Sequence, residues 1–415
     1  MREYLGLDWD SHGHWNGPFF FVQVTDPQLG FAKAGGPTGG PSWEIESERL
    51  LRMVGVVNRL RPKFLLVTGD MTHAPPGEEF YEGQVTSVRQ ILAKVSETVP
   101  ILFCPGNHDL GNAHGQNDDA SDYVIRFGAD YYSFWWGGVR GLVLNTSLWA
   151  CPTANPDRRL DQERWLDQEL EVANLNAHHL MVIGHHPWFL RDPLEDEHAT
   201  WTPIPKETRL RWLSKMARCR VVKLILAGHC RQNYEARIKR PLPAVHKPPS
   251  KPKPTTNTPA QSEGDNDVSK TDDSSSQKMD IPTSDSELVD AAKSDGQQEG
   301  VNGGGSESWG GAKTGGDDEE GRGGEGRGRG VCEQTAAGDV ESDEDPGRVS
   351  DEAEDDQVAD GVDIRSVVTS SCTAPLGPDP PGFRVIRVFS RRIEHEYFTL
   401  DNPPSAVELP RDDHD

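Results

Sequence analysis

The sequence predicts an α/β protein in which buried strands alternate with helices. Short apolar runs rich in β-branched and aromatic residues have the length of strands, and they lie at 19–25, 64–68, 101–104, 141–146, 180–184 and 221–228. These runs are apolar along their whole length, which is typical of strands buried on both faces. Helical periods lie between most of them, and this alternation favours a layered α/β architecture.

Segments with the 3.6-residue apolar period of amphipathic helices separate several of these runs. The segments cover 43–60, 85–99 and 160–175, and Asp161 is the expected N-cap of the third. Strand-like sequence resumes near the C-terminus, at 362–372, 383–390 and 393–400. The fold is therefore expected to include strands from both ends of the sequence.

The segment from 244 to 361 has a composition that does not favour a folded core. It is rich in Ser, Asp, Gly and Pro, and Trp309 is its one aromatic residue. Residues 251–360 carry 29 acidic and 10 basic side chains, a net charge of −19 out of −24 for the whole chain. So few apolar groups cannot offset the entropy lost on ordering. The predicted organisation is an N-terminal extension at 1–15, a split domain at 16–243 and 362–402, a disordered acidic insert at 244–361, and a tail at 403–415.

Composition argues against several classes of function. The remaining residues carry a net charge of only −5, so neither part offers the broad basic surface that nucleic-acid binding needs. The N-terminus lacks the apolar stretch of a signal peptide, and no run of 18 apolar residues could span a membrane. Six cysteines without a C-x-x-C pair favour free thiols in a reducing compartment. We therefore expect a cytoplasmic monomer without nucleic-acid or membrane partners.

Polar residues follow five of the predicted strands directly. They are Asp26 and Gln28, Asp70 and His73, Asn107 to Asp109, His185 and His186, and His229. Open α/β sheets place ligand sites beyond the carboxyl ends of their strands, so we expect these side chains to converge. Carboxylate, amide and imidazole groups without thiolate suit hard or borderline divalent ions. Any one of these residues alone is more often a turn former or cap, but five strand ends together favour a metal site.

The motif order D…GDxxH…GNHD…H…GH resembles the calcineurin-like metallophosphoesterase superfamily. The similarity is closest to a small eukaryotic group assigned protein serine/threonine phosphatase activity, through GPFFFVQVTDPQLG, GDMTHAPPG, GNHDLGN and DYYSFWWGGV. This resemblance implies a four-layer sandwich of two mixed β-sheets flanked by helices. It also implies that a metal-activated hydroxide attacks a phosphorylated protein or a small phosphoester. The expected enzyme is thus a phosphomonoesterase acting on phosphoserine or phosphothreonine.

The resemblance further implies a two-metal site, with ions of the manganese, iron or zinc type bridged by Asp70. The other ligands that it implies are Asn107, His185 and His229 for one ion, and Asp26 and Gln28 for the other. His108 would protonate the leaving alkoxide, and Asp109 would fix the orientation of His108. His73 would support the metal-binding loop without binding metal itself.

Arg231 departs from the family pattern, which has a second histidine two residues after His229. A guanidinium carries no acceptor and cannot bind a cation. Either two ions still bind and one of them is weakened, or Arg231 occupies the slot and clamps phosphate beside a single tightly bound ion. A third alternative is a pseudoenzyme that binds a phosphorylated ligand with little turnover. Phosphodiesterase activity also stays open, because the metal motifs do not distinguish monoesters from diesters.

Overall fold

The computed structural model describes residues 7–32, 39–111, 120–238, 242 and 363–410, all of which belong to one compact unit. The predicted insert at 244–361 lies outside the described residues, so its disorder stays a prediction. Within the described residues, no helix combines the length and the apolar character needed to cross a membrane.

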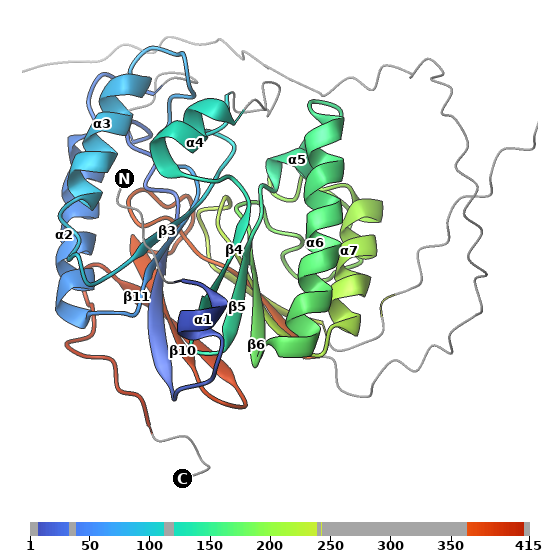
Figure 1. Cartoon of the computed structure of the whole chain (residues 1–415). Helices are drawn as coiled ribbons and strands as arrows, with labels where there is room; N and C mark the ends of the chain where they lie inside the picture. The colour runs from blue at the N-terminus through green and yellow to red at the C-terminus, as the bar shows by residue number, and fades with distance from the viewer. Residues whose placement is uncertain (1–6, 33–38, 112–119, 239–241, 243–362, 411–415) are drawn as a thin grey trace, which may run out of the picture. The chain divides into compact units, whose positions relative to one another are not determined.

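The strands of the described chain form two mixed sheets (Figure 1). The five-stranded sheet has the order β11-β10-β1-β2-β3, with β1 at Phe19–Val24, β2 at Leu65–Thr68, β3 at Ile101–Cys104, β10 at Gly382–Val388 and β11 at Ile393–Thr399. The six-stranded sheet has the order β4-β5-β6-β7-β9-β8, with β4 at Tyr132–Trp136, β5 at Val139–Val143, β6 at His179–Ile183, β7 at Val222–Ala227, β8 at Tyr234–Ile238 and β9 at Ile364–Val368. Strands β1, β2 and β3 are parallel, as are β5, β6, β7 and β9.

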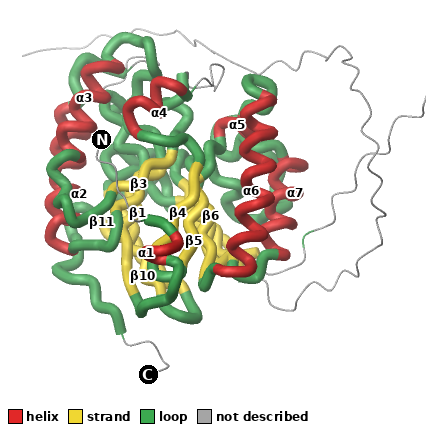
Figure 2. The backbone as a smooth tube through the Cα atoms, in the orientation of Figure 1, coloured by secondary structure: helices red, strands yellow, loops and turns green. Residues whose placement is uncertain are grey.

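Helices cover the outer face of each sheet, which gives four layers (Figure 2). Helices α2 (Glu44–Leu60), α3 (Tyr81–Leu92) and α4 (Ser121–Phe127) pack on the five-stranded sheet. Helices α6 (Pro156–Asn176) and α7 (Lys206–Arg218), with the short α5 (Ser147–Ala150), pack on the six-stranded sheet. The short α1 (Trp9–His12) contacts β4. The predicted α/β sandwich of two mixed sheets is confirmed.

Each sheet shares one apolar cluster with its helices, and the two sheets bury another apolar cluster between them. Phe21 and Leu66 from the five-stranded sheet lie in this cluster with Met181 and Leu224 from the six-stranded sheet. Alternate residues of each strand therefore face the other sheet or the helices, which explains why the runs are apolar throughout.

Two helix predictions differ from the structure in their bounds, and helix α7 was not predicted. Helix α6 begins at Pro156, because Asn155 accepts a hydrogen bond from the Arg158 amide (3.2 Å) and proline favours the first helical position. Asp161 therefore lies inside the helix and is not its N-cap. Helix α3 begins and ends earlier than the predicted 85–99. Helix α7 is absent from the sequence prediction, since the buried Arg209 interrupts its apolar stripe.

Candidate metal centre

The five polar strand ends lie together where the two sheets meet. Asp70 and Asn107 follow β2 and β3 of one sheet, and His185 and His229 follow β6 and β7 of the other. The amide of His229 donates to Asp26 Oδ2 (3.0 Å), which joins the ends of β7 and β1. The convergence predicted for these strand ends is therefore present in the fold.

Glycines allow the strand ends to approach one another this closely. A Cβ atom on Gly106 would collide with the carboxylate and backbone of Asp70, and one on Gly228 would collide with the hydroxyl of Thr25. These two glycines thus allow close packing of the loops.

Backbone strain is concentrated in the same place. Non-glycine residues with positive φ in these loops are Asp26 (49°), Gln28 (37°), Asp70 (54°), His229 (68°) and Arg231 (55°). Each such residue costs on the order of 1–2 kcal/mol, and strain of this kind clusters at functional sites. The surrounding fold therefore holds these side chains in conformations that an isolated loop would not adopt.

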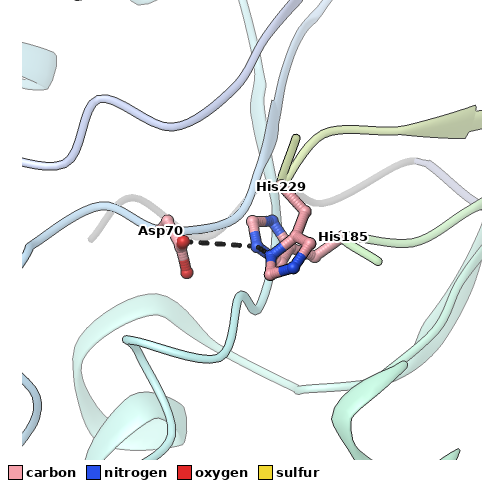
Figure 3. A group of neighbouring side chains, drawn as sticks. All are labelled: Asp70, His185 and His229. Carbon is pink, nitrogen blue, oxygen red and sulfur yellow. Dashed lines mark hydrogen bonds and ion pairs between the residues drawn. The ribbon is translucent and has the colours of Figure 1, made fainter. Parts of the chain in front are cut away.

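Four acceptor atoms converge on one point of this site. His185 Nε2 lies 3.3 Å from Asp70 Oδ2, 3.2 Å from Asn107 Oδ1 and 3.2 Å from His229 Nδ1. Figure 3 shows the two imidazoles and the carboxylate turned toward one another. Asp70 and Asn107 come from one sheet and the two histidines from the other, so each sheet supplies half of the group.

Backbone carbonyls determine which histidine nitrogens face the site. His185 Nδ1 lies 2.9 Å from the Thr68 carbonyl, and His229 Nε2 lies 2.6 Å from the Thr200 carbonyl. A carbonyl only accepts, so each of these nitrogens carries the proton and donates it. The nitrogens that face Asp70 are then lone pairs, and clustered lone pairs at these distances call for a cation between them. The donor set fits a divalent metal ion, and its other hydrogen bonds are those of metal-binding histidines.

The charges of this group act on one another strongly. Burial lowers the pKa of His185, but Asp70, Asp26 and the Thr68 carbonyl together outweigh burial and raise this pKa to about 9. Burial and the adjacent His185 lower the pKa of His229 to about 4. Burial opposes ionisation of Asp70, yet His185 and His108 hold its pKa well below the usual range. In the metal-free protein a proton on His185 therefore provides the positive charge that the acceptors require.

Asp26 and Gln28 present two further acceptors. Asp26 Oδ2 accepts from the Thr25 hydroxyl (2.6 Å), while its Oδ1 is buried without a hydrogen-bond partner in the described chain. Gln28 Nε2 donates to His73 Nδ1 (3.3 Å), and its Oε1 is likewise buried and unpartnered among these residues. Burial raises the pKa of Asp26. His73, which was expected to support the metal loop, thus orients the amide of Gln28.

The contacts of Asp109 differ from the sequence-based expectation that it orients His108. His108 Nδ1 donates to the His73 carbonyl (2.6 Å), and the two imidazoles stack at 4.9 Å. The carboxylate of Asp109 instead accepts from three backbone amides, those of Gly106 (2.8 Å), Asp70 (2.8 Å) and Met71 (2.9 Å). The expected bond between Asp109 and the His108 ring is not among the described contacts, because the loop turns the carboxylate back toward these amides. Burial and the charge of Asp70 raise the pKa of Asp109 to about 7.

Arg231 lies within reach of the charges of Asp26 and Asp70 and is only 3% exposed. Its guanidinium carbon lies 3.4 Å from the centre of the Phe31 ring, and none of its three side-chain nitrogens has a hydrogen-bond partner within the described residues. Burial lowers its pKa, while Asp26 and Asp70 oppose that shift. The sequence does not reveal that Phe31 contacts Arg231, or that the Thr68 and Thr200 carbonyls orient the two histidines. Every residue type has a backbone carbonyl, so the sequence holds no signal for those two groups.

The fold and the metal centre together define a metallophosphoesterase. The chain belongs to the calcineurin-like phosphoesterase family, whose sequence pattern matches residues 21–230. As a member of that family the protein is a metal-dependent phosphoester hydrolase.

Named relatives are phosphatases. The zebrafish (Danio rerio) serine/threonine-protein phosphatase CPPED1 is 36% identical over 239 residues, which cover 56% of this chain and 76% of that protein. The human protein of the same name is 33% identical over 231 residues, covering 54% and 73%. Among solved structures, a dimetal phosphatase from Danio rerio aligns over 53% of this chain and 84% of its own, with 16% identity and a TM-score of 0.37.

Proposed function

We propose that this protein is a phosphomonoesterase that hydrolyses phosphoserine and phosphothreonine in proteins. The observation that carries the proposal is the convergence of Asp70, Asn107, His185 and His229. A backbone carbonyl accepts from one nitrogen of each histidine, which leaves the other nitrogen as an acceptor that faces the site. The phosphoprotein substrate is supported by the relatives, which are named serine/threonine-protein phosphatases.

These four residues would hold one divalent ion of the manganese, iron or zinc type. Asp26 and Gln28, with Asp70, would form the second of the two positions expected from the sequence. That position has fewer ligands, so we propose that only the first ion is tightly bound. A divalent ion bound here lowers the pKa of water toward about 7 and neutralises phosphoryl oxygens.

His108 is the proton donor in this proposal. Its Nδ1 donates to the His73 carbonyl, which leaves Nε2 to act on the substrate; in the imidazolium form, Nε2–H would give its proton to the leaving oxygen as the phosphorus–oxygen ester bond breaks. Asp109 acts indirectly, since its three amide bonds tie the loop after β2 to the loop after β3. His73 acts through Gln28 and His108, which it orients.

A cytoplasmic monomer stays part of the proposal. The five described cysteines, Cys104, Cys151, Cys219, Cys230 and Cys372, are free and buried, which supports a reducing compartment. We also propose one catalytic domain in two parts, 16–243 and 362–402, with the acidic insert at 244–361 between them.

Arg231 favours a second candidate function, a phospho-ligand-binding protein with little turnover. Its charge acts on Asp26 and Asp70, and this charge would weaken the position that would take a second ion. A phosphodiesterase is the third candidate, because the same metal ligands serve both ester types.

The test is release of phosphate from a phosphoserine peptide, a monoester and a diester by the Mn²⁺-loaded protein. We expect turnover of the peptide and monoester, and a loss of about 100-fold or more, near 3 kcal/mol, in Asp70→Asn. His14→Gln, which changes an exposed histidine away from the site, serves as the control. Stoichiometric peptide binding without phosphate release would establish the binding protein instead, and preferential cleavage of the diester would establish the diesterase.

A further inference from the structure

The position that would hold a second ion has acceptors from Asp26 and Gln28, but none from the end of β7. Asp26 Oδ1 and Gln28 Oε1 are buried and unpartnered, but the third contributor from the end of β7 is Arg231. All of the hydrogen-bonding atoms of a guanidinium are donors. The residues present therefore supply a full ligand set for one divalent ion at the Asp70, Asn107, His185 and His229 group, and only a partial set, with a cation in place of one ligand, for a second ion beside it.

Arg231 is held rigidly from both ends. Its backbone carbonyl accepts from the Ser370 hydroxyl (2.9 Å) and from the Leu376 amide (3.1 Å), and its φ is 55°. Its guanidinium lies over the Phe31 ring, and the centre of that ring lies 5.3 Å from the centre of the His73 imidazole, with the two rings at 77° to each other. A cation over an aromatic face is attracted by the ring, and more strongly when it is desolvated. The ring therefore fixes the plane of the guanidinium and leaves its N–H groups free to donate.

Those N–H groups have no acceptor in the described protein. Neither carboxylate that acts on Arg231, Asp26 or Asp70, forms an ion pair with it among the described residues. An unpaired buried charge is strongly destabilising, and buried polar groups are normally satisfied by protein, water or ligand. A buried, fixed and unsatisfied guanidinium beside a metal-binding group indicates a site for an anion.

We propose that Arg231 donates to the phosphoryl oxygens of the substrate, so that the site pairs one divalent ion with one guanidinium in place of two ions. The ligand is a tetrahedral oxyanion, because the planar fork of a guanidinium matches two oxygens of a phosphate. This inference rests on the proposed function for the identity of the substrate. Its evidence, however, is the set of unsatisfied nitrogens, which is independent of turnover.

Metal content and phosphate binding test this arrangement directly. We expect the wild-type protein to retain one Mn²⁺ per chain after gel filtration, and Arg231→His to retain two. Calorimetric titration of the Mn²⁺-loaded protein with inorganic phosphate should show a loss of affinity of about 10- to 100-fold in Arg231→Met. Arg164→Met, which removes an exposed arginine from α6, is the matched control and should bind phosphate as the wild type does.

A second variant separates the role of Arg231 from its effect on folding. Phe31→Leu leaves the guanidinium in the chain but removes the ring beneath it, and it should weaken phosphate binding by a smaller factor. Two tightly held ions in the wild type, or equal phosphate affinity in wild type, Arg231→Met and Phe31→Leu, would overturn the inference. If Arg231→Met loses phosphate affinity while the wild type hydrolyses no ester, the proposed function fails and this inference stands.

Discussion

The three amide bonds of Asp109 lead to a prediction that separates a structural role from a catalytic one. The side chain is 2% exposed, and its two oxygens accept from Gly106, Asp70 and Met71. Asp109→Ala leaves three amide N–H groups unpaired in a buried loop, at about 1–3 kcal/mol each. Some relaxation and water entry reduce that sum, so we expect a loss of about 3–5 kcal/mol in the free energy of unfolding.

Asp109→Asn is the sharper variant, since it keeps the shape of the side chain. Its amide oxygen can replace Oδ2 and accept from Gly106 and Asp70, but its NH₂ group then faces the N–H of Met71. One amide is left unpaired, so we expect a loss of about 2 kcal/mol, between wild type and Asp109→Ala.

The measurement is urea unfolding in EDTA, which removes the contribution of bound metal. Asp161→Asn on the exposed surface of α6 is the control and should change stability by less than about 0.5 kcal/mol. The reasoning is refuted if both Asp109 variants unfold like the wild type while turnover is lost. That result would return Asp109 to the role expected from the sequence, the orientation of His108.

Three other predictions concern pH, metal and packing. Burial lowers the pKa of His395 to about 4, so the unfolded state binds more protons than the folded state between about pH 4 and 6.5. The free energy of unfolding should therefore fall as the pH drops through this window, and it should fall less steeply in His395→Gln. Urea unfolding at several pH values measures both. Mn²⁺ at 100 times its Kd should add about 2.7 kcal/mol to the free energy of unfolding, and His229→Gln should remove most of that gain in the same assay. Gly228→Ala forces a methyl group against Thr25 and should lower the free energy of unfolding by about 1–3 kcal/mol. Gly55 on α2 has open space around it, so Gly55→Ala should raise the melting temperature slightly.

The sequence predicts the α/β class and the place of the site well, because both depend on local patterns. Apolar runs identify strands buried on both faces, and residues such as Asp70 and His229 stand directly after them. The sequence also predicts the C-terminal strands β9, β10 and β11, which follow a long intervening segment. Such features are set by residues close together in the chain.

Features set by distant contacts could not be predicted in this way. The orientation of His229 depends on the Thr200 carbonyl, and any residue type could supply that group. Asp109 adjoins His108 in sequence, yet its carboxylate turns toward amides of a different strand end. The unsatisfied state of Arg231 depends on its stacking over Phe31, two hundred residues earlier in the chain.

The division of ligands between the two sheets has a mechanical consequence. An ion held by Asp70 and Asn107 on one side and by His185 and His229 on the other would link the two sheets to each other. Sliding of one sheet against the other by a fraction of an ångström would pull the donors apart. Substitutions in the intersheet cluster, at Phe21 or Met181 for example, should therefore alter ion affinity even though neither residue is near the metal in sequence.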